Sequence, residues 1–252
     1  MIFGEPERTE WDLRFPLFGI PVRVHPLFWV MGVLLGMNRA DPILLIVWIA
    51  AVFPAILIHE LGHALVMRSF GFYPSIVLYG MGGLASYGPG RLYRAREPGT
   101  FGHVAIALAG PGAGFALAGL LYGALRAAGY PVDVWVDPFV LVHVRLAGGE
   151  LAGSWHLAVL VNDLFFVCIY WGIINLLPIY PLDGGQIAQR ILVLANPRGG
   201  VRLSLVISMV TAGVVAVVGV VQLGDWWTGL FFVYLAANSY AMLKWDRGEW
   251  QD

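Results

Sequence analysis

The chain has 252 residues, of which 59% are hydrophobic and 12% are charged. Soluble domains carry about 25% charged residues, so this composition excludes an ordinary soluble domain and predicts an exterior that faces lipid. The net charge of −1 argues against a nucleic-acid partner, and a single cysteine, Cys168, excludes an internal disulfide bond.

Six apolar stretches are predicted to cross the membrane, because a spanning helix needs roughly 20 mainly apolar residues. They follow an acidic N-terminal segment that predicts no removable signal peptide. In chain order they cover about residues 24–37, 42–67, 101–125, 155–177, 203–223 and 226–243, and the first is the shortest. The last two predict a C-terminal helical hairpin over 201–245. The predicted fold class is therefore an all-α polytopic membrane protein with about six transmembrane helices.

Basic residues are distributed unequally between the two sides of this predicted topology. If the N-terminus is cytosolic, twelve Arg and Lys residues fall on the cytosolic side, and only Arg39, Arg126 and Arg145 fall on the outer side. Cytosolic loops of membrane proteins carry the excess of Arg and Lys. Both termini are therefore predicted to lie in the cytosol.

Two segments outside the spans have the alternation of β-strands. Ser75–Tyr79 and Leu84–Tyr87 flank a turn that contains Gly82 and Gly83, which predicts a short β-hairpin between the second and third spans. Residues 130–147 also alternate but are too short and broken to span as a helix. They are predicted to be either a strand pair or an interfacial segment on the outer side.

Three polar residues lie near the end of the second span, where they are costly. His59 and His63 are four residues apart, so they project from one face of a helix and can bind one metal ion. Glu60 is beside them, placed to take a proton from water. This is the H-E-x-x-H arrangement of zinc hydrolases. The alternative is that neighbouring helices satisfy the hydrogen bonds of two histidines and a glutamate in the core. Because clustered polar groups within lipid cost free energy, the pattern favours a metal site over this alternative.

A catalytic zinc site needs a third protein ligand, and depth in the membrane selects Asp183. The two histidines lie about 25–32 Å along the second span from its outer end at 1.5 Å per residue, close to the cytosolic side. Asp163 is about 12 Å from the outer face on the same scale and is too shallow. Asp183 follows the fourth span at its cytosolic end, after a break at Pro178 and Pro181. His103, near the cytosolic start of the third span, is the competing third ligand.

With these residues in place, the sequence resembles the site-2 protease family of intramembrane zinc metalloproteases. His59, Glu60 and His63 match one hallmark motif, and the segment from Asn175 to Asp183, followed by glycine, matches the other. The resemblance covers about residues 15–200. It implies one Zn²⁺ held by the two histidines and Asp183, with Glu60 as the base. It also implies a single membrane-embedded domain over 1–252, with a catalytic core at about 42–196 and no PDZ or CBS domain.

The resemblance further implies regulated intramembrane proteolysis of transmembrane or membrane-associated proteins near the cytosolic side of a bacterial or archaeal cell membrane. Asn175 is predicted either to contact the substrate or oxyanion, or to cap freed carbonyl groups. The hairpin that contains Gly82 and Gly83 is predicted either to pair with an unwound substrate segment as an added strand or to be a loop that plugs the site. In the third span, Gly114 stands where many members carry asparagine, so only a packing role is expected there. The alternatives are a metal-binding transporter and an inactive relative that binds membrane helices. The sequence predicts no oligomeric state.

Overall fold

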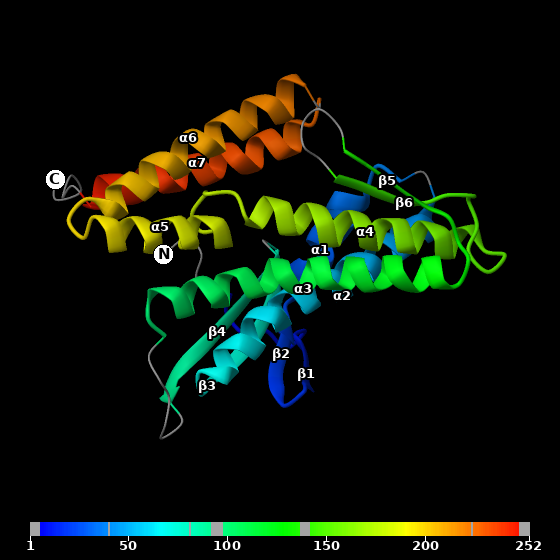
Figure 1. The fold of residues 1–252 in the computed structure, drawn as a ribbon, viewed down its shortest axis with the longest axis horizontal. Helices are drawn as coiled ribbons and strands as arrows, with labels where there is room; N and C mark the ends of the chain where they lie inside the picture. Colours follow the sequence, from blue (N-terminus) through cyan, green and yellow to red (C-terminus); the bar gives the residue numbers. More distant parts are fainter. Residues whose placement is uncertain are drawn as a thin grey trace. The chain divides into compact units, whose positions relative to one another are not determined.

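A computed structural model describes residues 6–39, 41–80, 82–91, 98–136, 142–222 and 224–246. The chain forms two compact units. The first contains residues 1–97 and 109–172, and the second contains residues 98–108 and 173–252, so the helices α3 (Thr100–Ala127) and α4 (Trp155–Asn175) contribute to both. Figure 1 shows the elements in chain order.

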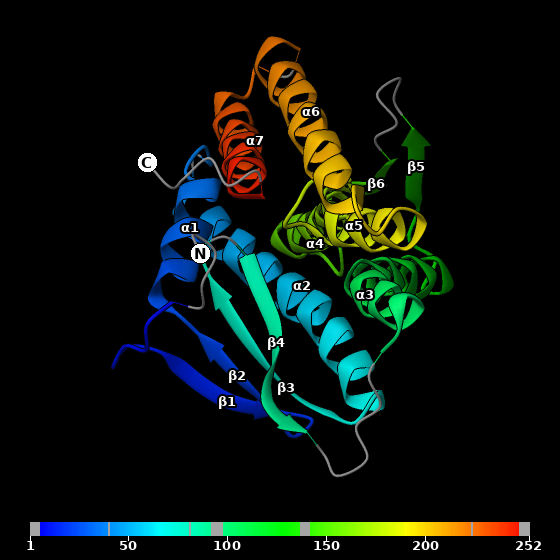
Figure 2. The same ribbon diagram turned by 90° about the vertical axis from the view of Figure 1, so that its left-hand side faces the viewer.

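The first unit contains a four-stranded sheet in the order β1-β2-β3-β4. Its strands are β1 (Leu13–Leu17), β2 (Ile20–Val24), β3 (Phe72–Tyr79) and β4 (Gly82–Arg91). The β3–β4 pair is antiparallel and confirms the predicted hairpin, while β2 pairs with β3 in parallel. Figure 2 shows the four strands side by side next to α2, with β1 and β4 at the two edges.

Strands β1 and β2 were not predicted, and they correct the start of the first expected span. A tight turn at Phe18 and Gly19 joins them, with φ angles of 49° and 77°. Two consecutive residues with positive φ produce the twist that an antiparallel pair requires. Val24 therefore ends a strand, and the first helix begins at Pro26.

Two helices of the first unit, α1 (Pro26–Gly36) and α2 (Pro42–Ser69), pack on one another and on β3. Asp41 caps the start of α2, because its carboxylate accepts a hydrogen bond of 2.8 Å from the backbone N–H of Ile43. The buried residues of α2 include His59, Glu60 and His63, so its polar triplet lies inside the protein.

Residues 132–136 and 142–146 form a strand pair, the first of the two predicted possibilities. Strands β5 (Val132–Val136) and β6 (Val142–Leu146) are antiparallel. The side-chain oxygen of Asn162 in α4 accepts a hydrogen bond of 2.7 Å from the backbone N–H of Leu146. This contact ties the strand pair to α4.

The carboxylate of Asp163 forms an ion pair and does not contribute to a metal site. Arg39, between α1 and α2, donates two hydrogen bonds of 2.7 and 2.9 Å to its two oxygens. The guanidinium also lies 5.0 Å from the ring centroid of Trp48. Such a bidentate pair satisfies a charge that would be costly alone in an apolar environment.

The second unit contains α5 (Asp183–Ala195), α6 (Gly200–Val221) and α7 (Trp226–Asp246). Helices α6 and α7 pack together in the region of the predicted C-terminal hairpin. The buried hydroxyl groups of Ser208 and Ser239 lie 2.8 Å apart between them. Helix α5 was not predicted.

Four helices in the described residues, α2, α3, α4 and α6, are long and apolar enough to cross a membrane. Helix α1 is apolar but has only 11 residues, about 16 Å of helix against a hydrocarbon core of about 30 Å. Helix α7 covers the sixth expected span but is not among the four. The expected number of six spans is therefore not confirmed.

Candidate metal centre

The two histidines of α2 face each other one helical turn apart. Their Nε2 atoms are 3.2 Å apart, and their ring centroids are separated by 4.9 Å. His59 is 3% exposed, His63 6% and Glu60 5%. The predicted triplet is thus a buried cluster in a helix that is apolar enough to span a membrane.

The geometry of the two imidazoles fits a zinc ion. Two nitrogen ligands of a tetrahedral zinc, each about 2.0–2.1 Å from the metal, lie about 3.3 Å apart. The separation of 3.2 Å between the two Nε2 atoms agrees with this value. The imidazoles are therefore oriented as two ligands of one metal ion.

Gly110 in α3 keeps space open beside the imidazoles. A Cβ atom at this position would overlap the Nε2 of His63 and would lie 2.8 Å from the Nε2 of His59. Any side chain there would occupy the volume in which a metal ion would sit. The sequence pattern at Gly110–Gly114 predicted only close helix packing, because one glycine among several in an apolar helix does not indicate a neighbouring metal site.

Glu60 lies against the start of β4. A Cβ atom at Gly83 would be 2.5 Å from the Cδ of Glu60, and one at Gly82 would be 2.6 Å from the ring of Trp171. Gly82 also has a φ of 112°, which favours glycine. Gly83 therefore brings the β4 backbone close to the carboxylate of Glu60, while Gly82 brings it close to Trp171.

Glycines also control the packing of α2 and α4 on α3. A Cβ atom at Gly62 would meet the backbone of Ala109, and one at Gly114 would lie 3.2 Å from the carbonyl oxygen of Cys168. Gly114 thus has the packing role that its small size predicts.

In the second unit, Asp183 is the buried first residue of α5 and follows the break at residues 176–182. Cβ atoms at Gly184 and Gly185 would collide with the backbone of Leu176 and Ile179, so the helix begins in direct contact with the preceding loop. The backbone N–H of Tyr180 donates a hydrogen bond of 2.7 Å to the hydroxyl of Ser208. These contacts fix the loop that leads into Asp183.

Asn175, the last residue of α4, is buried. His103, the competing third ligand, is partly buried in the first turn of α3. Within the described part of the chain, the buried side chains that could each supply a metal ligand include His59 and His63 in the first unit and Asp183 in the second. His103 is not among these buried side chains.

Comparison with known proteins identifies the family. The model of Peptidase family M50 matches residues 47–218, more than half of the chain. The chain belongs to peptidase family M50. This membership, with four apolar helices, makes the protein an integral membrane protein and makes zinc its metal.

Two relatives agree with this assignment. A candidate zinc metalloprotease of Synechocystis sp. is 25% identical over 246 residues, which cover 88% of this chain and 57% of that protein. The chain thus spans little more than half the length of this curated relative. A solved structure, the site-2 protease from Methanocaldococcus jannaschii, superimposes with a TM-score of 0.57 at 18% identity, covering 92% of this chain and 95% of that one. The fold is therefore that of a site-2 protease.

Proposed function

We propose that the protein is an intramembrane zinc metalloprotease that cleaves membrane-embedded protein substrates near the cytosolic side of the bilayer. The observation that carries this proposal is the buried pair of imidazoles beside Glu60 in an apolar helix, with the separation that two zinc ligands require. Membership of peptidase family M50 supports the same chemistry.

Zinc would be held by His59 and His63 and by the carboxylate of Asp183. When bound, the ion would polarise the scissile carbonyl group and lower the pKa of water. Three protein ligands leave one position open, as in catalytic zinc sites. Gly110 keeps volume free next to both imidazoles.

Glu60 would act as the general base and acid. Its buried carboxylate would accept a proton from the attacking water and then transfer it to the leaving amine. Its position against Gly83 places the proton acceptor at the start of an edge strand, where an extended substrate segment could lie.

The substrate would bind as an added strand at β4. A peptide bond inside a transmembrane helix is shielded, so the substrate must unwind before cleavage. An edge strand offers unpaired backbone donors and acceptors to such a segment. Gly82 and Gly83 would bring that edge to Glu60, and Asn175 would orient the substrate or the oxyanion.

Both termini would face the cytosol, as the excess of basic residues on that side predicts. Single cysteines at Glu10 and Glu150, introduced into a Cys168→Ala background, test this orientation. A membrane-impermeant maleimide added outside intact cells should label the cysteine at position 150 and not the one at position 10. The reverse labelling pattern would show that the termini lie outside and that the proposed orientation is wrong.

The Glu60→Gln variant tests the proposed function. It should keep zinc, because Glu60 is not a ligand, while cleavage should fall about 10²- to 10⁴-fold with the loss of the proton acceptor. Quantitative proteomics of membranes with wild-type or variant protein should show shortened single-span proteins only with wild type. Equal fragment patterns with wild-type and Glu60→Gln protein would contradict the proposed protease activity and favour a metal-binding transporter or an inactive relative.

A further inference from the structure

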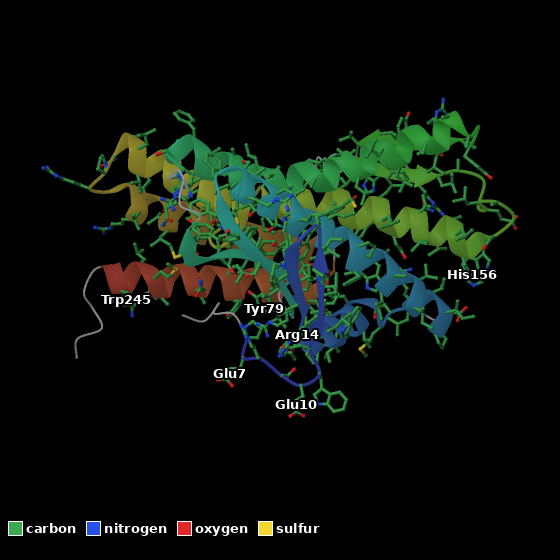
Figure 3. The ribbon with its side chains drawn as sticks, turned by 90° about the horizontal axis from the view of Figure 1, so that it is seen from below. Glu7, Glu10, Arg14, Tyr79, His156 and Trp245 are labelled. Carbon is green, nitrogen blue, oxygen red and sulfur yellow. The ribbon has the colours of Figure 1, made fainter. Side chains whose placement is uncertain are left out.

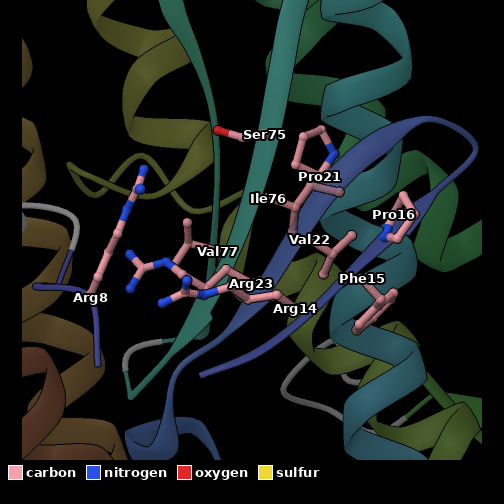
Figure 4. Close-up of a pocket in the computed structure, with 10 residues that line it drawn as sticks. All are labelled: Arg8, Arg14, Phe15, Pro16, Pro21, Val22, Arg23, Ser75, Ile76 and Val77. Atoms are coloured by element: carbon pink, nitrogen blue, oxygen red, sulfur yellow. The ribbon is translucent and has the colours of Figure 1, made fainter. Parts of the chain in front are cut away.

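A pocket of about 420 Å³ lies on the sheet of the first unit, between β1, β2 and β3. One side is lined by Arg8, Arg14 and Arg23, and the other by apolar side chains that include Phe15 and Pro21. Figure 4 shows the arginines on one side together with Val77, and Phe15, Pro16, Pro21 and Val22 on the other. The pocket is therefore amphipathic, with a cationic end and an apolar wall.

One carboxylate offsets part of this positive charge. Asp12 accepts hydrogen bonds from Arg23 at 3.1 Å and from Arg14 at 3.3 Å. Desolvation acts to raise the pKa of Asp12, but hydrogen bonds from Thr9 and both arginines outweigh it and hold the pKa far below its ordinary value. Asp12 thus remains ionised, and three guanidinium groups against one carboxylate leave two positive charges.

The arginines differ in how much of each is available to a ligand. Arg23 is buried and also donates to the backbone oxygens of Pro6 and Glu7, so it is a fixed charge at the base of the pocket. Arg14 has a side chain that is 54% exposed and uses only its Nη2 atom in hydrogen bonds to described residues. Arg8 is exposed and forms no ion pair within the described segments.

The nearby acidic side chains do not close the pocket. Glu7 and Glu10 are exposed, and Figure 3 shows both pointing outward from the ribbon near Arg14. Two guanidinium groups with free N–H donors suit a phosphate, which arginine binds with paired hydrogen bonds. The apolar wall suits a ligand that carries hydrocarbon next to that phosphate.

Exposed aromatic side chains surround the same strands. Trp11 is 84% exposed and Phe18 is 70% exposed, at the two ends of β1. Exposed tryptophan and phenylalanine near arginine are typical of segments that lie in a membrane interface. The proposed topology puts this sheet on the cytosolic side, where bilayers present anionic lipids.

We propose that the pocket between β1, β2 and β3 binds the phosphate of an anionic phospholipid headgroup through Arg8 and Arg14. The buried Arg23 would add a fixed positive charge that attracts the phosphate. The site rests on the membrane orientation of the proposed function and not on peptide hydrolysis. Bound lipid would anchor the sheet that carries the β3–β4 hairpin to the membrane surface.

Titration of the purified, zinc-loaded full chain with phosphatidylglycerol and phosphatidylcholine tests the site by native mass spectrometry. Wild type should bind phosphatidylglycerol more tightly. The Arg8→Gln/Arg14→Gln double variant should lose about 10- to 30-fold in affinity for it, since each basic residue near an anionic surface contributes to binding. Arg8→Gln alone, at an exposed position, should lose about fivefold without a change in melting temperature.

Arg198→Gln/Arg202→Gln is the matched control, because both residues are exposed and the same charge is removed from the second unit. This control and Glu60→Gln should bind phosphatidylglycerol as wild type does, which separates the lipid site from the proposed function. Equal binding of the two lipids, or an unaffected Arg8→Gln/Arg14→Gln variant, would overturn the proposal. So would displacement of the lipid by millimolar inorganic phosphate, or tight binding of an acidic peptide in its place.

Discussion

The absence of a side chain at Gly110 in α3 leaves space beside the Nε2 atoms of His59 and His63. A Cβ atom at this position would overlap one imidazole and approach the other. This open space makes Gly110 a positioning residue for the metal site, although it offers no ligand itself.

We expect Gly110→Ala to weaken zinc binding while the protein still folds. The added methyl group would displace the imidazoles, and disturbing groups around a metal typically costs about 10- to 100-fold in affinity. Competition with a fluorescent zinc chelator on the purified protein measures the change.

Gly112→Ala is the matched control for this prediction. It lies in the same helix, and a Cβ atom there meets nothing within 4 Å. Alanine has the higher helix propensity, so the control should keep zinc affinity and melt at the same temperature or slightly higher. Equal zinc affinity of Gly110→Ala and Gly112→Ala would show that the space beside the histidines is not needed.

At the scale of elements, the loop between α4 and α5 depends on the C-terminal hairpin. The backbone N–H of Tyr180 donates to Ser208 in α6, whose hydroxyl also contacts Ser239 in α7. Both serine side chains are buried. The two helices thus hold the segment that precedes Asp183 through a short chain of hydrogen bonds.

Ser208→Ala should destabilise this loop. The N–H of Tyr180 would lose its acceptor, at a cost of about 1 kcal/mol for a part-buried hydrogen bond. We expect a lower melting temperature and a severalfold faster loss of zinc to a chelator. Ser204→Ala is the control, because the Ser204 hydroxyl donates only within its own helix, to Val201. Similar zinc-loss rates for the two variants would contradict this role of Ser208.

The elements that sequence predicted well are those with a strong local signal. The predicted spans at 42–67, 101–125 and 155–177 correspond to α2, α3 and α4. These helices were predictable because a helix that crosses lipid needs a long run of apolar residues, which is visible in the sequence. The H-E-x-x-H spacing correctly predicted that His59 and His63 converge on one face.

Elements without such a signal were missed. Strands β1 and β2 have only five residues each, and β2 takes its place in the sheet by pairing with β3, which lies some 50 residues later, while β1 pairs with β2. Helix α5 follows a proline-rich break and was not predicted, because the apolar stretches that predict spans do not include it. The contacts of Gly110 and Ser208 arise from tertiary packing, which no single-sequence pattern reports.

At the scale of the whole molecule, the proposed zinc ligands come from segments that are far apart in the sequence. His59 and His63 come from one helix, while Asp183 follows the α4–α5 break about 120 residues later. A catalytic zinc site requires three such ligands and an open position. The proposed chemistry depends on these three side chains binding the same ion.

Zinc content of the purified full-length protein, measured by inductively coupled plasma mass spectrometry after dialysis against a weak chelator, tests this claim most directly. We predict about one zinc ion per chain for wild type and for Glu60→Gln, and little zinc for His63→Ala and Asp183→Ala, because a catalytic site needs all three ligands. Wild-type zinc content in Asp183→Ala, with loss of zinc in His103→Ala, would contradict the account.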